Sequence, residues 1–181
     1  MGRYQGMVIS GYGGQGILTV GMIIAQAGIM EGLEVSWMPS YGPEMRGGTA
    51  YVHVIMSDEQ IGSPILNSAT SLIAMNSLSF AKYQDMVVDG GIILVDGSLV
   101  HEKLEDDRRE FFSLPATKIA TDKYTTSSYA NIILMGKLIA RTNIVKAESF
   151  EKALYVVLPD RYHSLIPAEM EMLRLGMEYQ G

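Results

Sequence analysis

The fold is decided by residues 6–16, which read Gly6-Met7-Val8-Ile9-Ser10-Gly11-Tyr12-Gly13-Gly14-Gln15-Gly16. The apolar run that opens this stretch is typical of a buried parallel strand. The glycines allow a sharp turn, and residues 17–30 then carry apolar side chains at three- and four-residue steps, which predicts a helix. Gly32 is placed to end that helix. A strand, a glycine turn and a helix in this order predict an α/β fold.

Further along the chain, strand-like and helix-like segments alternate. A second strand is expected over residues 34–38, stopped by Pro39, and the charged run 101–110 reads as a solvated turn or short helix. The remaining expected elements are strands at 49–56, 71–75, 91–96 and 117–120, a helical turn at 78–83, and helices at 129–140, 147–158 and 168–179. We therefore expect a three-layer α/β/α fold with a mostly parallel, Rossmann-like central sheet. A single domain should span residues 1–181, with its site at the carboxyl ends of the strands.

Composition excludes several classes of function. The 181 residues contain no cysteine, which excludes disulfides, a thiolate nucleophile, Cys-ligated zinc and a cysteine-held iron–sulfur cluster within this chain. A pI of about 5.0 argues against a nucleic-acid partner. The longest apolar-rich segment, residues 16–30, contains Thr19 and Gln26, so no membrane span is expected, and no secretory leader is visible. The expected location is the cytoplasm.

Charged side chains are unevenly distributed. Residues 1–100 hold only three basic and eight acidic side chains. One explanation is a central sheet that is buried on both faces. The other is that partner subunits also cover this half, because interface cores are poor in charge and rich in Met, Tyr and Trp. The 13 methionines and 10 tyrosines agree with the second explanation, and both can hold together.

The segment Gly11-Tyr12-Gly13-Gly14-Gln15-Gly16 fits the pattern G-x-G-x-x-G between a strand and a helix. Its backbone can approach a ligand closely, and the helix N-terminus offers unpaired N–H groups and partial positive charge. A dinucleotide site should also have an acid at the end of the second strand, but Ser36-Trp37-Met38-Pro39 stands there. A phosphate or carboxylate of another ligand, or a tight turn packed against a neighbouring chain, fits the motif better.

A second unusual segment, Ser40-Tyr41-Gly42-Pro43-Glu44-Met45-Arg46-Gly47-Gly48-Thr49, should leave the second strand at the same sheet edge as the glycine turn. Arg46 is one of few basic residues in this half of the chain, and an Arg in such surroundings needs an anionic partner. That partner is either Glu44 or Asp96, in an ion pair that orders the loop, or the phosphate of a ligand or the carboxylate of a partner chain.

Other motifs are weaker. His53, His101 and His163 stand apart from one another, and none has a second metal-type ligand at useful spacing. Asp96-Gly97 matches only part of the G-D-G segment of thiamine-diphosphate sites, because Val95 replaces its first glycine. The Mg²⁺–diphosphate site is therefore expected in another chain.

Taken together, the glycine turn and Pro39-Ser40-Tyr41-Gly42-Pro43-Glu44-Met45-Arg46-Gly47-Gly48-Thr49-Ala50 resemble the gamma subunit of 2-oxoacid:ferredoxin oxidoreductases. The likeness extends to Ile61-Gly62-Ser63-Pro64, the Asp96-Gly97 strand end and residues 131–136, and so covers essentially the whole chain. Among the substrate branches of the family, the sequence looks most like the 2-oxoglutarate type.

The resemblance implies a multi-subunit enzyme that decarboxylates a 2-oxoacid, reduces ferredoxin and forms an acyl-CoA. Alpha and beta chains, with a possible delta chain, would hold thiamine diphosphate, Mg²⁺ and the iron–sulfur clusters. The chain in hand would complete the assembly and help to bind coenzyme A, without a catalytic residue or metal of its own. The residues implied at that site are Gly11, Gly13, Gly14, Gln15, Gly16, Ser40, Tyr41, Arg46 and Thr49.

Two other functions stay open. A free-standing nucleotide- or acyl-CoA-binding module would need no redox partners, and it would purify as a solitary monomer. A dinucleotide dehydrogenase is disfavoured, because the acid expected after Trp37 is missing.

Overall fold

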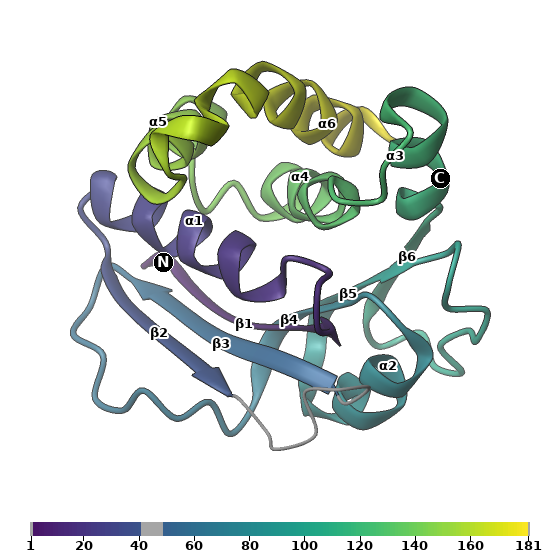
Figure 1. Ribbon diagram of the computed structural model, residues 1–181. Helices are drawn as coiled ribbons and strands as arrows, with labels where there is room; N and C mark the ends of the chain where they lie inside the picture. The colour runs from purple at the N-terminus through teal and green to yellow at the C-terminus, as the bar shows by residue number, and fades with distance from the viewer. Residues whose placement is uncertain (1, 41–48, 181) are drawn as a thin grey trace.

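The computed structural model describes residues 2–40 and 49–180. Its sheet has six strands in the order β2-β3-β1-β4-β5-β6 (Figure 1). Three of the five strand pairs, β1·β4, β4·β5 and β5·β6, are parallel, and only β3 runs against its neighbours. The strands are β1 Tyr4–Tyr12, β2 Glu34–Ser40, β3 Thr49–Ser57, β4 Ala69–Ala74, β5 Val87–Asp96 and β6 Glu110–Leu114. The mostly parallel sheet is confirmed, with one antiparallel strand inserted between β1 and β2.

Helices lie on both faces of the sheet (Figure 1). They are α1 Ile17–Met30, α2 Ser77–Tyr83, α3 Ala116–Tyr124, α4 Ala130–Thr142, α5 Ala147–Val157 and α6 Ile166–Glu178, with 3₁₀ turns at Gln84–Met86 and Asp160–Leu165. One face carries α1, α4, α5 and α6, and α2 covers part of the other. The predicted α/β/α class is therefore confirmed, with most of the helical mass on one side. Helix α1 has the bounds that its apolar spacing predicts, and Gly32 follows it with φ +75°.

The two faces of the sheet have separate apolar cores. Met7 and Ile9 on β1 point into the larger core beneath α1 and α4, and Val8 between them points into the smaller core with Phe80 of α2. All three β1 side chains are fully buried. The low charge of the first half of the chain is thus explained in part by a sheet whose central strands are covered on both sides.

Helices α4 and α6 approach each other closely at two glycines. A Cβ added to Gly176 of α6 would lie 1.9 Å from the Ile133 carbonyl oxygen, and one added to Gly136 of α4 would lie 2.1 Å from the Leu173 carbonyl oxygen. No side chain fits at either position, so these glycines set the distance between the two helices.

Two expectations about secondary structure were wrong. Residues 117–120 belong to helix α3 and not to a strand, and the preceding strand, β6, lies in residues 110–114. Ala116 and Ala120, four residues apart, face the core, and Asp96 caps the helix from β5 by accepting hydrogen bonds from Thr117. Pro39 does not end β2, which continues to Ser40. Proline is tolerated there because β2 is an edge strand.

The chain leaves two neighbouring parallel strands toward opposite faces. After β1 it enters α1 on one face, and after β4 it enters α2 on the other (Figure 1). A crevice at the carboxyl ends of two such strands is where open α/β sheets bind ligands. Within residues 2–40 and 49–180, no helix combines the length and hydropathy that crossing a bilayer requires.

Candidate functional site

The glycine turn, residues 11–16, forms a tight corner between β1 and α1, the glycine corner. Gly14 and Gly16 adopt left-handed backbone conformations, with φ of +91° and +70°. A Cβ at Gly16 would also lie 2.3 Å from Nδ2 of Asn131 on α4. A side chain at Gly16 is therefore excluded by both backbone strain and close packing.

Gln15 ties the corner to the neighbouring strand. Its Oε1 accepts a hydrogen bond from the Tyr12 amide at 2.6 Å, and its Nε2 donates to the Met75 carbonyl at 3.3 Å. Asn131 Nδ2 donates to the Gln15 carbonyl at 3.0 Å. The Gln15 side chain thus spans the crevice between β1 and β4, where it holds the turn in shape. Its predicted role as a ligand contact stays a prediction.

Within residues 2–40 and 49–180, no side chain caps the N-terminus of α1. The first intrahelical bond runs from the Val20 amide to the Gly16 carbonyl at 3.0 Å. The amides of the three preceding helical residues therefore have no acceptor within the helix. Gly16 offers no capping side chain, and the first turn contains no acidic residue. These amides and the positive end of the helix dipole favour an anionic group.

A pocket of 320 Å³ lies against this helix end. Tyr12, Gly13, Gly14, Leu18, Thr19 and Ala50 are among the residues that line it. The predicted Gly13, Gly14 and Gly16 all border this pocket, whereas Gly11 is buried within β1. A ligand in the pocket would meet backbone N–H groups, the Thr19 side chain and apolar surface.

The predicted strand ends meet at one edge of the sheet. Tyr12 is paired with Thr49, and Ser40 is paired with Tyr51, which places the end of β2 and the start of β3 beside the glycine corner. The backbone positions of Ser40 and Thr49 therefore agree with the expectation. Tyr41 and Arg46 lie outside the described residues, as does the predicted choice of an ion-pair partner for Arg46.

The acid of a dinucleotide site is absent from the expected place. Glu34, at the start of β2, pairs with Ser57, at the end of the strands that lies away from the glycine turn, and Glu31 bonds to Arg3. No acidic residue lies in β2 after Glu34. The geometry thus agrees with the sequence in disfavouring a nicotinamide or flavin dinucleotide.

A second cavity, of 140 Å³, adjoins the first and was not anticipated from the sequence. Gly16 and Thr19 line both, and α4 and α6 contribute Asn131 and Glu169 to the second. Burial raises the pKa of the Glu169 carboxyl to about 7. The sequence signal was faint: Glu169 is one acid among many in the charged second half, and only folding brings it to the glycine corner.

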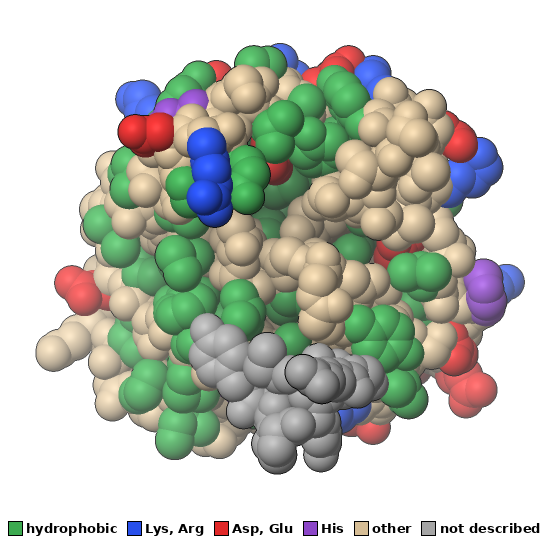
Figure 2. All heavy atoms as spheres, viewed as in Figure 1, with side chains coloured by type: hydrophobic (Ala, Val, Ile, Leu, Met, Phe, Trp, Pro, Cys, Tyr) green, Lys and Arg blue, Asp and Glu red, His purple; other side chains and the backbone are tan. Residues whose placement is uncertain are grey.

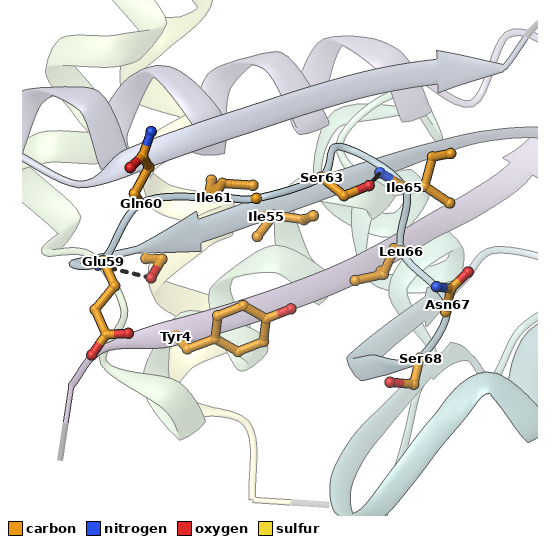
Figure 3. A pocket seen from close by; sticks show the side chains of 12 residues that line it. Tyr4, Ile55, Glu59, Gln60, Ile61, Ser63, Ile65, Leu66, Asn67 and Ser68 are labelled. Carbon is orange, nitrogen blue, oxygen red and sulfur yellow. Dashed lines mark hydrogen bonds between the residues drawn. The ribbon is translucent and has the colours of Figure 1, made fainter.

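Another pocket lies at the opposite end of the strands, away from the glycine turn (Figure 3). It measures 380 Å³, and Tyr4, at the start of β1, lines it together with Ile61, Gly62 and Ser63. The Tyr4 ring points toward the loop that follows β3, and Ser63 accepts a hydrogen bond from the Ile65 amide within this loop. The segment 61–64, part of the resemblance, is therefore separate from the glycine corner.

The histidines and Asp96 do not join the site. His53 is buried in β3, its ring nitrogens have no partner among the described residues, and burial lowers its pKa. The Asp96 carboxylate is fully buried and accepts hydrogen bonds from Thr117 and the Ser98 amide. In the described ranges, 2–40 and 49–180, no three His, Cys, Asp or Glu side chains gather as metal ligands would.

Comparison with known proteins identifies the family. A family model described as pyruvate ferredoxin/flavodoxin oxidoreductase matches residues 6–179. The 2-oxoglutarate synthase subunit KorC of Methanocaldococcus jannaschii is 37% identical over 153 residues, which cover 83% of this chain and 82% of KorC. The ketoisovalerate oxidoreductase subunit VorA of Methanothermobacter thermautotrophicus is 36% identical over 172 residues, 94% of this chain. The match spans only 35% of the length of VorA.

Solved structures of other proteins also match this chain. The crystal structure of a keto/oxoacid ferredoxin oxidoreductase gamma subunit from Geobacter sulfurreducens has a TM-score of 0.80 and 31% identity, and the match covers 96% of each chain. A 2-oxoglutarate:ferredoxin oxidoreductase from Magnetococcus marinus has the same fold, with a TM-score of 0.84 at 20% identity over 96% of this chain and 30% of the other. The chain therefore belongs to the pyruvate ferredoxin/flavodoxin oxidoreductase family, as a gamma subunit of a multi-subunit 2-oxoacid:ferredoxin oxidoreductase.

Proposed function

We propose that the assembled enzyme converts a 2-oxoacid and coenzyme A into an acyl-CoA and CO₂, and that this chain supplies part of the coenzyme A site. In the overall reaction, the bond between the carboxylate and the carbonyl carbon breaks and a thioester bond forms. One proton and two electrons are released, and ferredoxin accepts the electrons. The Magnetococcus marinus enzyme was solved with 2-oxoglutarate, coenzyme A and succinyl-CoA bound. We take 2-oxoglutarate as the first substrate to test, because KorC relatives are named for it.

The N-terminus of α1, which no described side chain caps, is, with its 320 Å³ pocket, the observation that carries this proposal. Coenzyme A carries phosphate groups, and backbone amides at a helix N-terminus bind such groups well. The ligand contacts proposed here are the residues expected from the sequence: Gly11, Gly13, Gly14, Gln15, Gly16, Ser40, Tyr41, Arg46 and Thr49.

The redox cofactors belong, in this proposal, to the other subunits. The chain has no cysteine to bind an iron–sulfur cluster, and the Asp96 carboxylate is engaged with Thr117 and Ser98. Thiamine diphosphate, Mg²⁺ and the clusters would be held by alpha, beta and possibly delta chains. This chain would bind and orient the thiol-bearing ligand, with no catalytic residue of its own, and would be inactive alone. We propose a cytoplasmic location and a single domain over residues 1–181.

The coenzyme A site can be tested with a charge at the helix end. We expect Thr19→Glu to weaken the apparent affinity of the assembled enzyme for coenzyme A by about tenfold or more, because like charges would meet at the phosphate site. An acid in the first turn stabilises a helix by about 0.3–1 kcal/mol, so unfolding would not explain the loss. Affinity is measured by calorimetry on the purified complex.

The neutral Thr19→Gln is the matched control, and it should bind coenzyme A nearly as the wild type does. Arg46→Ala, with assembly intact, should also weaken binding. If Thr19→Glu, Thr19→Gln and Arg46→Ala all leave the affinity unchanged, coenzyme A does not bind at this corner.

Partner subunits are proposed to cover the outward face of α1. This helix contains no charged residue, and Met22, Ile29 and Met30 are 41%, 54% and 40% exposed. In Figure 2, most of the charged side chains in view lie around the rim of the face, and hydrophobic and uncharged side chains lie between them. Charge-poor surfaces of this kind are typical of interface cores.

Assembly tests this surface. Ile29→Lys should reduce the amount of alpha and beta chains that co-purify with this chain, because a lysine would be buried unpaired at the interface. Ile65→Lys, at an equally exposed position by the pocket of Figure 3, is the control and should assemble normally. Normal assembly of both variants would show that α1 is not an interface.

A further inference from the structure

The 140 Å³ cavity beside the glycine corner has a distinct chemical character. Its floor is apolar, formed by Val20 and Ile23 of α1 and Ile132 of α4. It continues from the pocket at the α1 N-terminus, because Gly16 and Thr19 line both. At about 30 Å³ per water molecule, this volume corresponds to about four or five waters, or to one small planar group.

Asn131, one of the residues that line this cavity, has an unpaired acceptor. Its Nδ2 donates to the Gln15 carbonyl at 3.0 Å. A carbonyl can only accept, so the orientation of the Asn131 amide is fixed and the Oδ1 atom must point elsewhere. The side chain is 94% buried (6% exposed), and Oδ1 has no partner among the described residues. A buried acceptor in this state costs free energy until a donor reaches it.

Glu169 of α6 adds a carboxyl group to the lining of the cavity. It is partly buried in the first turn of α6, where burial disfavours its charged form. Among the described residues, no lysine or arginine lines the cavity, and the hydroxyl of Ser128, a lining residue, lies 2.9 Å from that of Thr126. Asn131 and Glu169, two residues that line the cavity, thus each carry an oxygen that can accept a hydrogen bond, Glu169 through its carbonyl oxygen even when it is protonated.

We infer that this cavity binds a neutral N–H donor, an amide or an aromatic amine, of the ligand whose anionic part lies at the α1 N-terminus. The apolar floor and the positive end of the neighbouring helix both disfavour an ammonium ion here. The inference rests on the proposed coenzyme A site, since that ligand offers two such sources. These are the amides of its pantetheine arm and the amino group of its adenine.

Glu169→Met is the decisive variant. It keeps the length of the side chain but removes both acceptor oxygens, and it should fold at least as stably because an unfavourably buried carboxyl is lost. We expect it to weaken coenzyme A binding to the assembled enzyme by about 5- to 20-fold, as expected for the loss of one hydrogen bond to a carboxyl group. The control is Glu171→Met on the same helix, where the carboxylate contacts Lys123 and Tyr124 away from the cavity.

Calorimetry with two fragments identifies the donor. If Glu169→Met weakens pantetheine but not adenosine 3′,5′-bisphosphate, the amides occupy the cavity, and the reverse result assigns it to the adenine. If Glu169→Met binds coenzyme A and both fragments as the wild type does, the inference is overturned. In that case a loss of affinity in Thr19→Glu would still support the coenzyme A site, so the two proposals fail separately.

Discussion

Glu169 should make the folding stability of this chain depend on pH in an unusual direction. Burial raises its pKa from the ordinary 4.5 to about 7 in the folded chain. Between these values the folded chain keeps a proton that the unfolded chain releases. The free energy of unfolding must therefore fall as pH rises through this window, and stay level above it. The difference of about 2.5 in pKa, at about 1.4 kcal/mol for each unit, amounts to about 3 kcal/mol.

Glu169→Gln isolates this effect, because glutamine has nearly the same shape and does not titrate. At pH 5 the variant should be more stable than the wild type by less than about 1 kcal/mol, and at pH 8 by about 3 kcal/mol. Urea unfolding of the full chain, followed by far-UV circular dichroism at pH 5, 6, 7 and 8, measures the difference. Contributions of other groups, such as His53, cancel between the two proteins.

Glu171→Gln is the matched control from the same helix. Lys123 and Tyr124 hold the pKa of Glu171 below its ordinary value, so its stabilising contribution is present above that value and lost only in more acidic solution. This control should not gain stability between pH 5 and 8. If Glu169→Gln and the wild type show parallel pH profiles, the Glu169 carboxyl is not buried and the cavity next to the glycine corner is wrongly described.

Two further predictions concern the fold. Gly176→Ala should destabilise the chain by on the order of 3 kcal/mol or more, because its methyl group would overlap the Ile133 carbonyl. Gly62→Ala, which has open space around it, should change the urea midpoint little, and equal midpoints for the two variants would contradict the close approach of α4 and α6. Thr117→Val should cost about 1 kcal/mol, measured in the same way, because it removes the hydroxyl that donates to Asp96. An unchanged midpoint would mean that this bond contributes nothing to the attachment of α3.

Local patterns in the sequence were sufficient wherever the relevant contacts are short in range. The bounds of α1 and the turn at Gly32 were predicted correctly, since both depend on apolar spacing and glycine conformation within a few residues. The glycine corner was also predictable from local sequence, because the residues with left-handed backbone conformations there, Gly14 and Gly16, are glycines. The missing acid at the end of β2 was also visible without a structure.

Expectations were wrong where a distant contact decides the local structure. Residues 117–120 are helical with the help of Asp96, about twenty residues earlier in the chain. Likewise, Pro39 is compatible with a strand only because β2 lies at the edge of the sheet. A local pattern contains neither piece of information.

The sequence alone determined the α/β class, the glycine corner at a helix N-terminus and the resemblance to gamma subunits, because each depends on residues that are near neighbours in the chain. Only the tertiary structure decided that β3 runs antiparallel between β1 and β2, that Gln15 bridges the crevice between β1 and β4, and that Asn131 and Glu169 meet at the corner. These features depend on strand order and helix packing. They join residues that lie far apart in the sequence, 60 positions for Gln15 and Met75 and 116 for Gln15 and Asn131, and the contacts of the whole core stabilise them together.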